Sequence, residues 1–214
     1  MFLTDPPIPS PIVVMPRYRT RTPLTAKIAR LARSMKESTE TTILPYSWIA
    51  VCQAFFRRYP NPYSTHVLSE DTLYREVSGT SLFSTRIFRK RATTSLPSWA
   101  QKLVNNPQVL ILEESVVDLG AKRLVSLTRN IDHKKLVVAT ETIEYIPTRG
   151  DPDKTLMTRH TSIRSPLGGL TGRMIEKVCH ARAIRNVKRT LQGFLYVLAQ
   201  QNGKPPGKPR IAIG

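Results

Sequence analysis

The chain has 214 residues, and 33 Lys and Arg against 15 Asp and Glu give it a formal charge of +18. This charge is large for a small domain, so the sequence predicts an anionic partner: a membrane surface, a lipid headgroup or nucleic acid. The chain has no run of eighteen apolar residues and hence no predicted transmembrane helix. Its two cysteines, Cys52 and Cys179, lack metal-binding spacing. We expect buried free thiols, although the sequence leaves their pairing open.

Residues 1–36 form a basic N-terminal extension that is rich in proline and arginine. Prolines exclude regular structure up to about residue 23, and apolar residues then recur at helical spacing from Leu24 to Met35. An arginine-rich, acid-poor, amphipathic start is typical of a mitochondrial targeting segment. A disordered tail and an arm that lies on RNA are the other two interpretations. The apolar stretch at 12–15 is too short for a secretory signal.

The patterned part of the chain begins with a β-branched stretch at 39–44, which predicts a strand. Ser47 is a suitable N-cap for a helix that follows it. The apolar face of this helix consists of Trp48, Val51, Cys52, Phe55 and Phe56.

A sharp basic corner ends this helix. Arg57 and Arg58 are followed at once by Pro60-Asn61-Pro62, and His66 then leads into the next strand. Proline fixes its own φ and keeps the preceding residue out of helical geometry, so the chain must turn beside two cations. The corner is either a helix end, where cations complement the dipole, or an anion-binding site. The residues alone leave both interpretations open.

The remaining elements follow a regular order. Strands are predicted at 67–77 and 82–89, a short helix near 98–104, and a hairpin at 109–118 and 123–132. Another antiparallel pair is expected at 136–146 and 156–164 across a loop at 147–154, and a long helix from about 173 to 200. This order predicts an α+β fold, with a curved antiparallel sheet of about seven strands wrapped on the long C-terminal helix. The domain spans 37–200, and a basic, proline-rich tail spans 201–214.

The last helix combines an apolar stripe with many cations. The stripe, expected to pack on the sheet, consists of Met174, Val178, Ala181, Ile184, Val187, Leu191, Leu195 and Leu198. Several basic residues lie three or four positions apart, where like charges repel one another. This arrangement indicates an anionic ligand, and a solvated basic face explains the same pattern. Arg182 and Arg189 are seven positions apart and hence share a face.

Several segments together resemble one known family. The segment 55–64, Phe-Phe-Arg-Arg-Tyr-Pro-Asn-Pro-Tyr-Ser, with His66 after it, resembles the PRELI (Ups/PRELI) domain family. Segments 96–99, 114–118 and 128–133 and the long basic helix resemble it in the same order, over roughly residues 38–200. The resemblance is closest to the PRELI-type phosphatidic acid carriers. It implies a lipid cavity between sheet and helix and phospholipid transfer between membranes in the mitochondrial intermembrane space, with a small twin-CX9C helical-hairpin protein as partner.

The resemblance also implies a set of phosphate-binding residues: Arg58, His66, Lys90, Arg182 and Arg189. The family typically has lysine at the two helix positions, and arginine there favours bidentate phosphate contacts. The alternatives are structural roles: Arg58 at a helix end, His66 as a loop histidine and Lys90 at a solvated edge. Segment 96–104 matches the family's lid loop, so Leu96, Trp99, Lys102 and Leu103 are expected to contact the membrane. Trp99 as a core residue is the alternative.

No catalytic constellation is present. The four histidines are dispersed, and no HExxH, GxSxG, P-loop or paired-carboxylate pattern occurs, so we expect no enzyme, cofactor or metal. The first functional hypothesis is a carrier of anionic phospholipid that docks on a mitochondrial membrane. The alternative is a structural protein of a mitochondrial ribonucleoprotein such as the matrix ribosome, which would bind ribosomal RNA through its basic arms. A void between sheet and last helix would favour the carrier, and a filled one the alternative.

Overall fold

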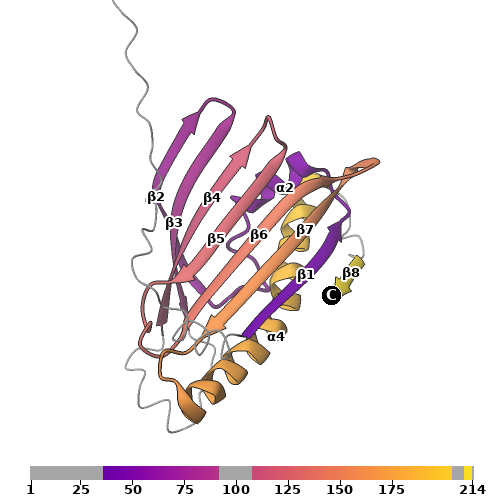
Figure 1. The fold of residues 1–214 in the computed structure, drawn as a ribbon. Helices are drawn as coiled ribbons and strands as arrows, with labels where there is room; N and C mark the ends of the chain where they lie inside the picture. Colours follow the sequence, from indigo (N-terminus) through magenta and orange to yellow (C-terminus); the bar gives the residue numbers. More distant parts are fainter. Residues whose placement is uncertain (1–35, 92–107, 204–209, 214) are drawn as a thin grey trace, which may run out of the picture.

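The computed structural model describes residues 36–91, 108–203 and 210–213, and Figure 1 shows the path of the chain. The elements are β1 (Lys36–Leu44), α2 (Trp48–Phe55), β2 (Val67–Ser78), β3 (Ser81–Arg91), β4 (Gln108–Asp118), β5 (Arg123–Asn130), β6 (Val138–Thr148), β7 (Asp151–Arg164), α4 (Gly169–Asn202) and β8 (Arg210–Ile213). Residues 1–35, the helix expected near 98–104 and most of the C-terminal tail lie outside the described ranges, so the expectations about them stay predictions.

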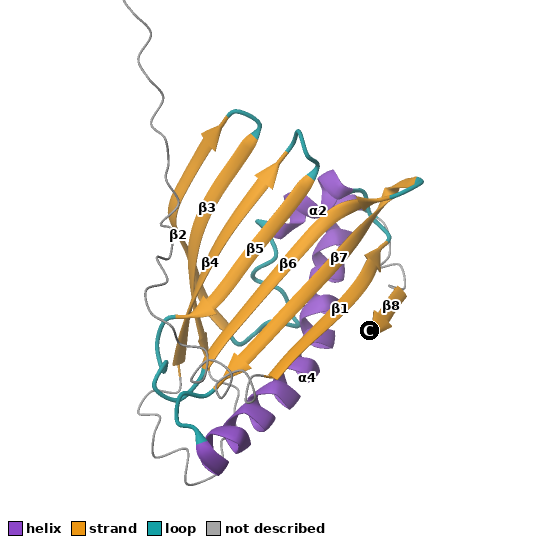
Figure 2. Ribbon diagram, in the orientation of Figure 1, coloured by secondary structure: helices purple, strands orange, loops and turns teal. Residues whose placement is uncertain are grey.

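The strands form a single curved antiparallel sheet in the order β2-β3-β4-β5-β6-β7-β1-β8. Both described helices lie on the same side of this sheet, with α4 running along it as the second layer (Figure 2). The α+β architecture expected from the sequence is therefore confirmed. Strands β2 to β7 follow one another as a meander, and β1 joins them beside β7, because the crossover through α2 carries the chain from one edge of the meander to the other.

The apolar core lies at one end of the sheet. There α2 and the C-terminal part of α4 pack together on a row of inward-facing apolar residues from neighbouring strands. Successive partners in this row are Leu82, Val117, Leu124, Tyr145 and Met157. The predicted apolar face of α2 is confirmed: Trp48, Val51, Cys52 and Phe55 are buried and Phe56 packs against them. Both cysteines are free, with Cys52 buried and Cys179 partly exposed.

Two boundaries differ from the sequence prediction. The prediction of a loop at 147–154 is wrong, because β6 and β7 extend to a turn that contains only Arg149 and Gly150. Gly150 has φ +78°, which suits a tight hairpin, and Pro147 lies at a register irregularity, where a sheet tolerates proline. The tail also contributes a strand, β8, which pairs with residues Glu40–Ile43 of β1. This strand has only four residues, too few for a clear strand pattern in the sequence. It forms because the edge of β1 offers a pairing partner.

The corner after α2 is fixed by Asn61. Its Nδ2 donates a hydrogen bond of 2.6 Å to the Arg58 carbonyl oxygen, and its Oδ1 accepts one of 3.0 Å from the Tyr63 amide. Helix α4 lies directly against this side chain, because a Cβ atom added at Gly193 would approach the Asn61 Oδ1 to 2.6 Å. The absence of a side chain at Gly193 therefore allows the helix to hold the corner in place.

We expect Gly193→Ala to destabilise the protein, by about 1–3 kcal/mol as is typical of overpacking. Asn61 cannot move away from the new methyl group without breaking the hydrogen bonds that form the corner. Gly172→Ala is the matched control on the same helix, because its Cβ would meet its nearest neighbour at an ordinary 3.6 Å. Alanine favours helix, so the control should be neutral or stabilising. Urea unfolding of both variants tests this, and equal stabilities would contradict it.

Candidate functional site: a cationic cavity

A cavity of about 370 Å³ lies between the curved sheet and α4. Its wall consists of residues of the corner after α2, of strands β3 to β7 and of the cavity-facing side of α4. Such a volume lies in the range of small-molecule pockets. Six cationic side chains and two carboxylates line it: Arg58, Lys90, Arg91, Arg129, Arg159 and Arg182 against Glu113 and Glu141. The wall therefore carries a net positive charge.

The sheet side of the cavity is polar because of the strand register. Next to the apolar core row comes a row with Ser84, Ser115 and Ser126 on successive strands. The following row contains charged residues, and its successive partners are Arg86, Glu113, Thr128, Glu141 and Thr161. Side chains of one row point to the same face of a sheet. These polar residues therefore leave space that the apolar core does not fill.

A chain of ion pairs crosses this polar surface. Glu113 on β4 binds Arg86 of β3 through its Oε1, with an Arg86 Nε to Oε1 distance of 3.0 Å, and binds Arg58 of the corner through its Oε2. Arg86 also pairs with Glu70 on β2. The side chains of Glu113 and Arg86 are 2% and 1% exposed. Because buried charges are tolerated only when paired, each member of this chain depends on its neighbours.

Arg58 lies inside the protein and not on a solvated helix end. Its side chain is 13% exposed, and its Nη1 donates a hydrogen bond of 2.7 Å to the Phe55 carbonyl oxygen. The guanidinium stacks on Phe55, with its Cζ 4.4 Å from the ring centroid. Arg58 thus forms part of the cavity wall, and Glu113 compensates its charge. Arg57, its neighbour, is exposed.

Lys90 and Arg58 lie beside the same pair of aromatic rings, those of Tyr59 and Phe88. The rings of Tyr59 and Phe88 are in contact, with centroids 5.6 Å apart. Arg58 Cζ is 5.1 Å from the Tyr59 ring centroid, and Lys90 Nζ is 5.4 Å from that of Phe88. Burial by itself would raise the pKa of Tyr59, but Lys90 and Arg58 together hold it below its ordinary value. Among the described residues, neither Lys90 nor Arg182 forms an ion pair.

The pKa of His66 reflects its burial and a group of three nearby cations, Lys90, Arg189 and Arg182. The His66 pKa is lowered to about 4, first by burial and then by Lys90, Arg189 and Arg182. His66 is therefore neutral at physiological pH. Its backbone carbonyl oxygen accepts a hydrogen bond of 2.7 Å from the Arg91 amide, which ties the corner to β3. The three cations that act on His66 come from two different elements, β3 and α4, so the fold concentrates positive charge here.

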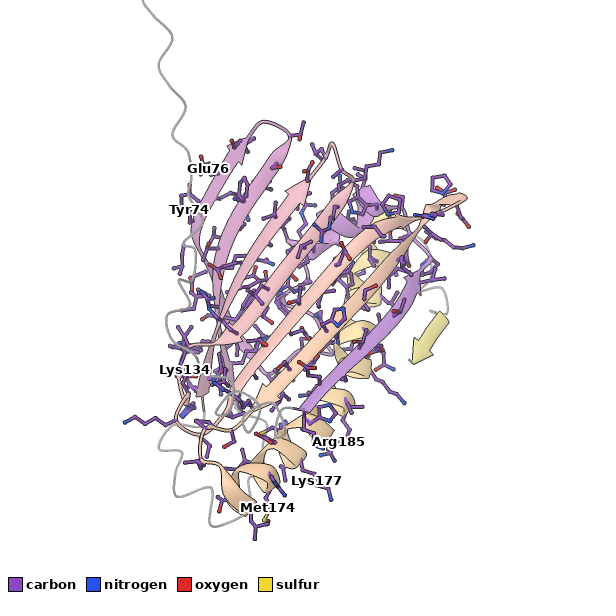
Figure 3. All side chains as sticks on the ribbon, viewed as in Figure 1. Tyr74, Glu76, Lys134, Met174, Lys177 and Arg185 are labelled. Atoms are coloured by element: carbon purple, nitrogen blue, oxygen red, sulfur yellow. The ribbon has the colours of Figure 1, made fainter. Side chains whose placement is uncertain are left out.

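The cavity-facing side of α4 is not the predicted apolar stripe over its first half. Leu191, Leu195 and Leu198 are buried as expected, but Met174 and Ile184 are about half exposed, at 51% and 48%. Figure 3 shows Met174, Lys177 and Arg185 pointing away from the sheet. The residues that line the cavity are Cys179, Arg182, Ala183, Asn186, Val187, Thr190, Leu191 and Phe194. In this half of the helix, the face that lines the cavity therefore coincides only in part with the predicted stripe.

The structure brings together four of the five predicted phosphate-binding residues. Arg58, His66, Lys90 and Arg182 all line the cavity. Arg189 does not; it is exposed, and its Nε donates a hydrogen bond of 2.8 Å to the Tyr63 carbonyl oxygen. The corner therefore lies over this turn of α4. The lid residues Leu96, Trp99, Lys102 and Leu103 lie outside the described residues.

Sequence reasoning missed the charged residues of the sheet. Glu113 and Arg159 line the cavity, and Arg86 lies behind it; all three are at most 4% exposed. Arg159 on β7 lies 3.5 Å from Glu141, measured from its Nε to the Glu141 Oε2. A signal existed for Glu113: it has the same parity as Ile111, Ser115 and Val117, the inward-facing residues of its strand. A charge at an inward position of a half-buried strand indicates a buried partner or a ligand.

Two kinds of site are absent from the described ranges. Within them, no group of three or more His, Cys, Asp or Glu is arranged to hold a metal ion. Neither described helix is long and apolar enough to cross a membrane.

Comparisons with known proteins place this geometry in context. Residues 50–204 match the model of the PRELI-like family. The chain is 37% identical over 174 residues to mouse "PRELI domain-containing protein 1, mitochondrial", covering 79% of each chain. It is 36% identical over 164 residues to "Protein ups1 homolog" of Schizosaccharomyces pombe, covering 76% of this chain and 95% of the relative.

A solved structure supports the fold independently. The crystal structure of the Zhui aromatase/cyclase from a Streptomyces species superimposes with a TM-score of 0.51 at 12% sequence identity, covering 78% of this chain and 93% of that one. At this identity the likeness concerns the fold alone, a sheet that grips a long helix. The family assignment rests on the sequence matches, which span both the corner and the cavity-facing helix, and on them this chain is a member of the PRELI-like family.

Proposed function

We propose that this protein is a non-catalytic carrier of an anionic phospholipid, typically phosphatidic acid, between membranes of the mitochondrion. The observation that carries the proposal is a set of cations in the cavity wall, Lys90, Arg91 and Arg182, that form no ion pair within the described part of the chain. Cations without carboxylate partners in a partly dehydrated site are a receptor for an anion. A phosphate is the anionic group of a phospholipid, and the apolar residues of the same wall suit its hydrocarbon part.

The arrangement of the wall indicates where each part of the lipid binds. We place the phosphate near Lys90, His66 and Arg182, within reach of Arg58, which lies beside the same Tyr59 and Phe88 rings as Lys90. Apolar wall residues such as Ile111, Val137 and Ile163 are available to the glycerol and the first methylene groups. The volume of the cavity is better matched to these parts than to two whole acyl chains. The rest of the chains therefore extends beyond the described wall.

The family resemblance motivates the proposed location and partners. Relatives carry the word mitochondrial in their names, and we assign this chain to the same organelle, in the intermembrane space. Anionic membrane surface and a small twin-CX9C helical-hairpin protein are the proposed partners. The open cavity counts against the structural ribonucleoprotein role, because a purely structural protein has no need of an unfilled cationic void. The basic arms that motivated that role lie outside the described residues.

Replacing Arg182 tests the site. We expect Arg182→Gln to weaken binding of phosphatidic acid about tenfold or more, since a hydrogen bond to a charged group contributes about 1.5–3 kcal/mol. Transfer of labelled phosphatidic acid between liposomes should slow in parallel. Arg185→Gln is the matched control, because it removes the same charge one turn away, where the side chain points to solvent. Equal losses in both variants would show that only overall charge matters, and no transfer by the wild-type protein would overturn the carrier role.

His66 provides a spectroscopic test. Because the folded protein keeps His66 neutral, it binds fewer protons than the unfolded chain between about pH 4 and 6.5, and stability from this residue falls as the pH is lowered through that window. A bound phosphate opposes the field of Lys90 and Arg182 and should raise the His66 pKa by a unit or more. NMR titration of the ring protons measures this. Zwitterionic phosphatidylcholine is the control lipid, and a His66 pKa that stays near 4 with saturating phosphatidic acid would place the phosphate elsewhere.

A further inference from the structure

Glu113 is a carboxylate in the wall of a cavity that is otherwise built for an anion. Its side chain is 2% exposed and lines the cavity beside Arg58. An ionised carboxylate has about four lone-pair sites. Two sites of Oε1 accept hydrogen bonds from Arg86, and one site of Oε2 accepts a hydrogen bond from Arg58. Among the residues that the structure describes, none occupies the second acceptor site of Oε2.

The two arginines fix the direction of this acceptor. Arg86 approaches from β3 and does not line the cavity itself. Arg58 approaches from the corner and is held by the Phe55 carbonyl oxygen. Any anion that reaches Arg58 therefore meets the Glu113 carboxylate as well.

The chemistry of the phosphate decides whether this encounter is favourable. A phosphomonoester has a second pKa of about 6, so it can enter as the monoanion and keep one P–OH group. That P–OH can donate a hydrogen bond to the Glu113 carboxylate, while its other oxygens accept from the cations. A phosphodiester carries the same single charge but has no P–OH. Next to Glu113 it offers only acceptor oxygens, and like-charged acceptors repel one another.

We propose that Glu113 is a specificity-determining residue that selects phosphomonoester headgroups over phosphodiester headgroups by accepting a hydrogen bond from the P–OH group. The inference rests on the proposed function, because it assumes that the cavity binds a phosphate. No covalent bond changes. One proton is shared between the phosphate and Oε2 of Glu113. The arginines supply charge for any phosphate, whereas Glu113 distinguishes one ester from the other.

Two short-chain lipids that differ in one methyl group test the proposal: dioctanoyl phosphatidic acid and dioctanoyl phosphatidylmethanol, its phosphodiester. We expect the wild-type protein to bind the monoester about tenfold to a hundredfold more tightly, the usual loss when a buried acceptor is left unpaired. In Glu113→Gln the amide can donate to a phosphate oxygen of either lipid. The preference should then fall to about threefold or less, with tighter binding of the diester.

Glu70→Gln is the matched control. Glu70 pairs with the same Arg86 but does not line the cavity, so its loss weakens the same chain of ion pairs without changing the cavity wall. This variant should keep the wild-type preference. Loss of the preference in both variants, or in neither, would overturn the role of Glu113. Equal binding of both lipids by the wild-type protein would refute the inference and leave the carrier role intact. Binding of neither lipid would refute both.

A second measurement applies if Glu113→Gln does not fold. Monoester binding at pH 8 should take up close to one proton, because the free lipid is largely dianionic there and the bound lipid is not. Diester binding should take up none. The groups that face Glu113 are Arg58, Arg86, Tyr59 and Tyr145, and the comparison between the two lipids subtracts any proton that these groups exchange with either lipid. His66 also lines the cavity, so both lipids are compared in a His66→Gln background by calorimetry in two buffers of different ionisation heat. Equal uptake for the two lipids would overturn the proposal.

Discussion

The pairing of Glu113 with Arg86 and Arg58 is the interaction on which the rest of the site depends. It joins β4, β3 and the corner after α2 through side chains that are almost completely buried. A buried charge is costly unless it is paired, so none of the three can be moved or replaced independently. The same pairing keeps polar groups on a face of the sheet that would otherwise be available to α4. The cavity exists because the sheet presents charge where a closed core would present apolar side chains.

The corner after α2 links these ion pairs to the position of the last helix, α4. Arg58 is directed inward by the Phe55 carbonyl oxygen, its own carbonyl oxygen accepts from Asn61, and Asn61 rests on Gly193. Each contact is local, but together they connect an ion pair in the sheet with the packing of α4. This explains why a glycine in the interior of a long helix is favourable here, although glycine weakens a helix by about 1 kcal/mol relative to alanine. The helix cannot approach the corner this closely with any larger residue.

The sequence predicted the elements well and the site only in part, for physical reasons that differ between residues. Alternation and helical spacing are local signals, so the strands, both helices and the corner were found from neighbouring residues. The pairing of Arg58 with Glu113 spans 55 positions and that of Arg86 with Glu113 spans 27, and no local pattern encodes either. Arg182 and Arg189 share a helix face, yet only Arg182 reaches the cavity, because the corner lies over the turn that carries Arg189. Helical spacing cannot show what covers the helix.

The net charge of the whole chain and the charges in the cavity wall bear on different properties, the first on attraction to polyanions in general and the second on the ligand of the cavity. A formal charge of +18 favours any polyanion and does not distinguish a membrane from RNA. Inside the cavity, what matters is which cations have an acidic partner and which do not. Arg58 and Arg86 are neutralised by Glu113 and Glu70, whereas Lys90, Arg91 and Arg182 have no acidic partner among the described residues. The buried ion pairs therefore define the shape of the site and leave a localised surplus of positive charge at its wall. The proposed phosphate would meet this surplus at one point, whereas a nucleic acid backbone presents an extended row of charges.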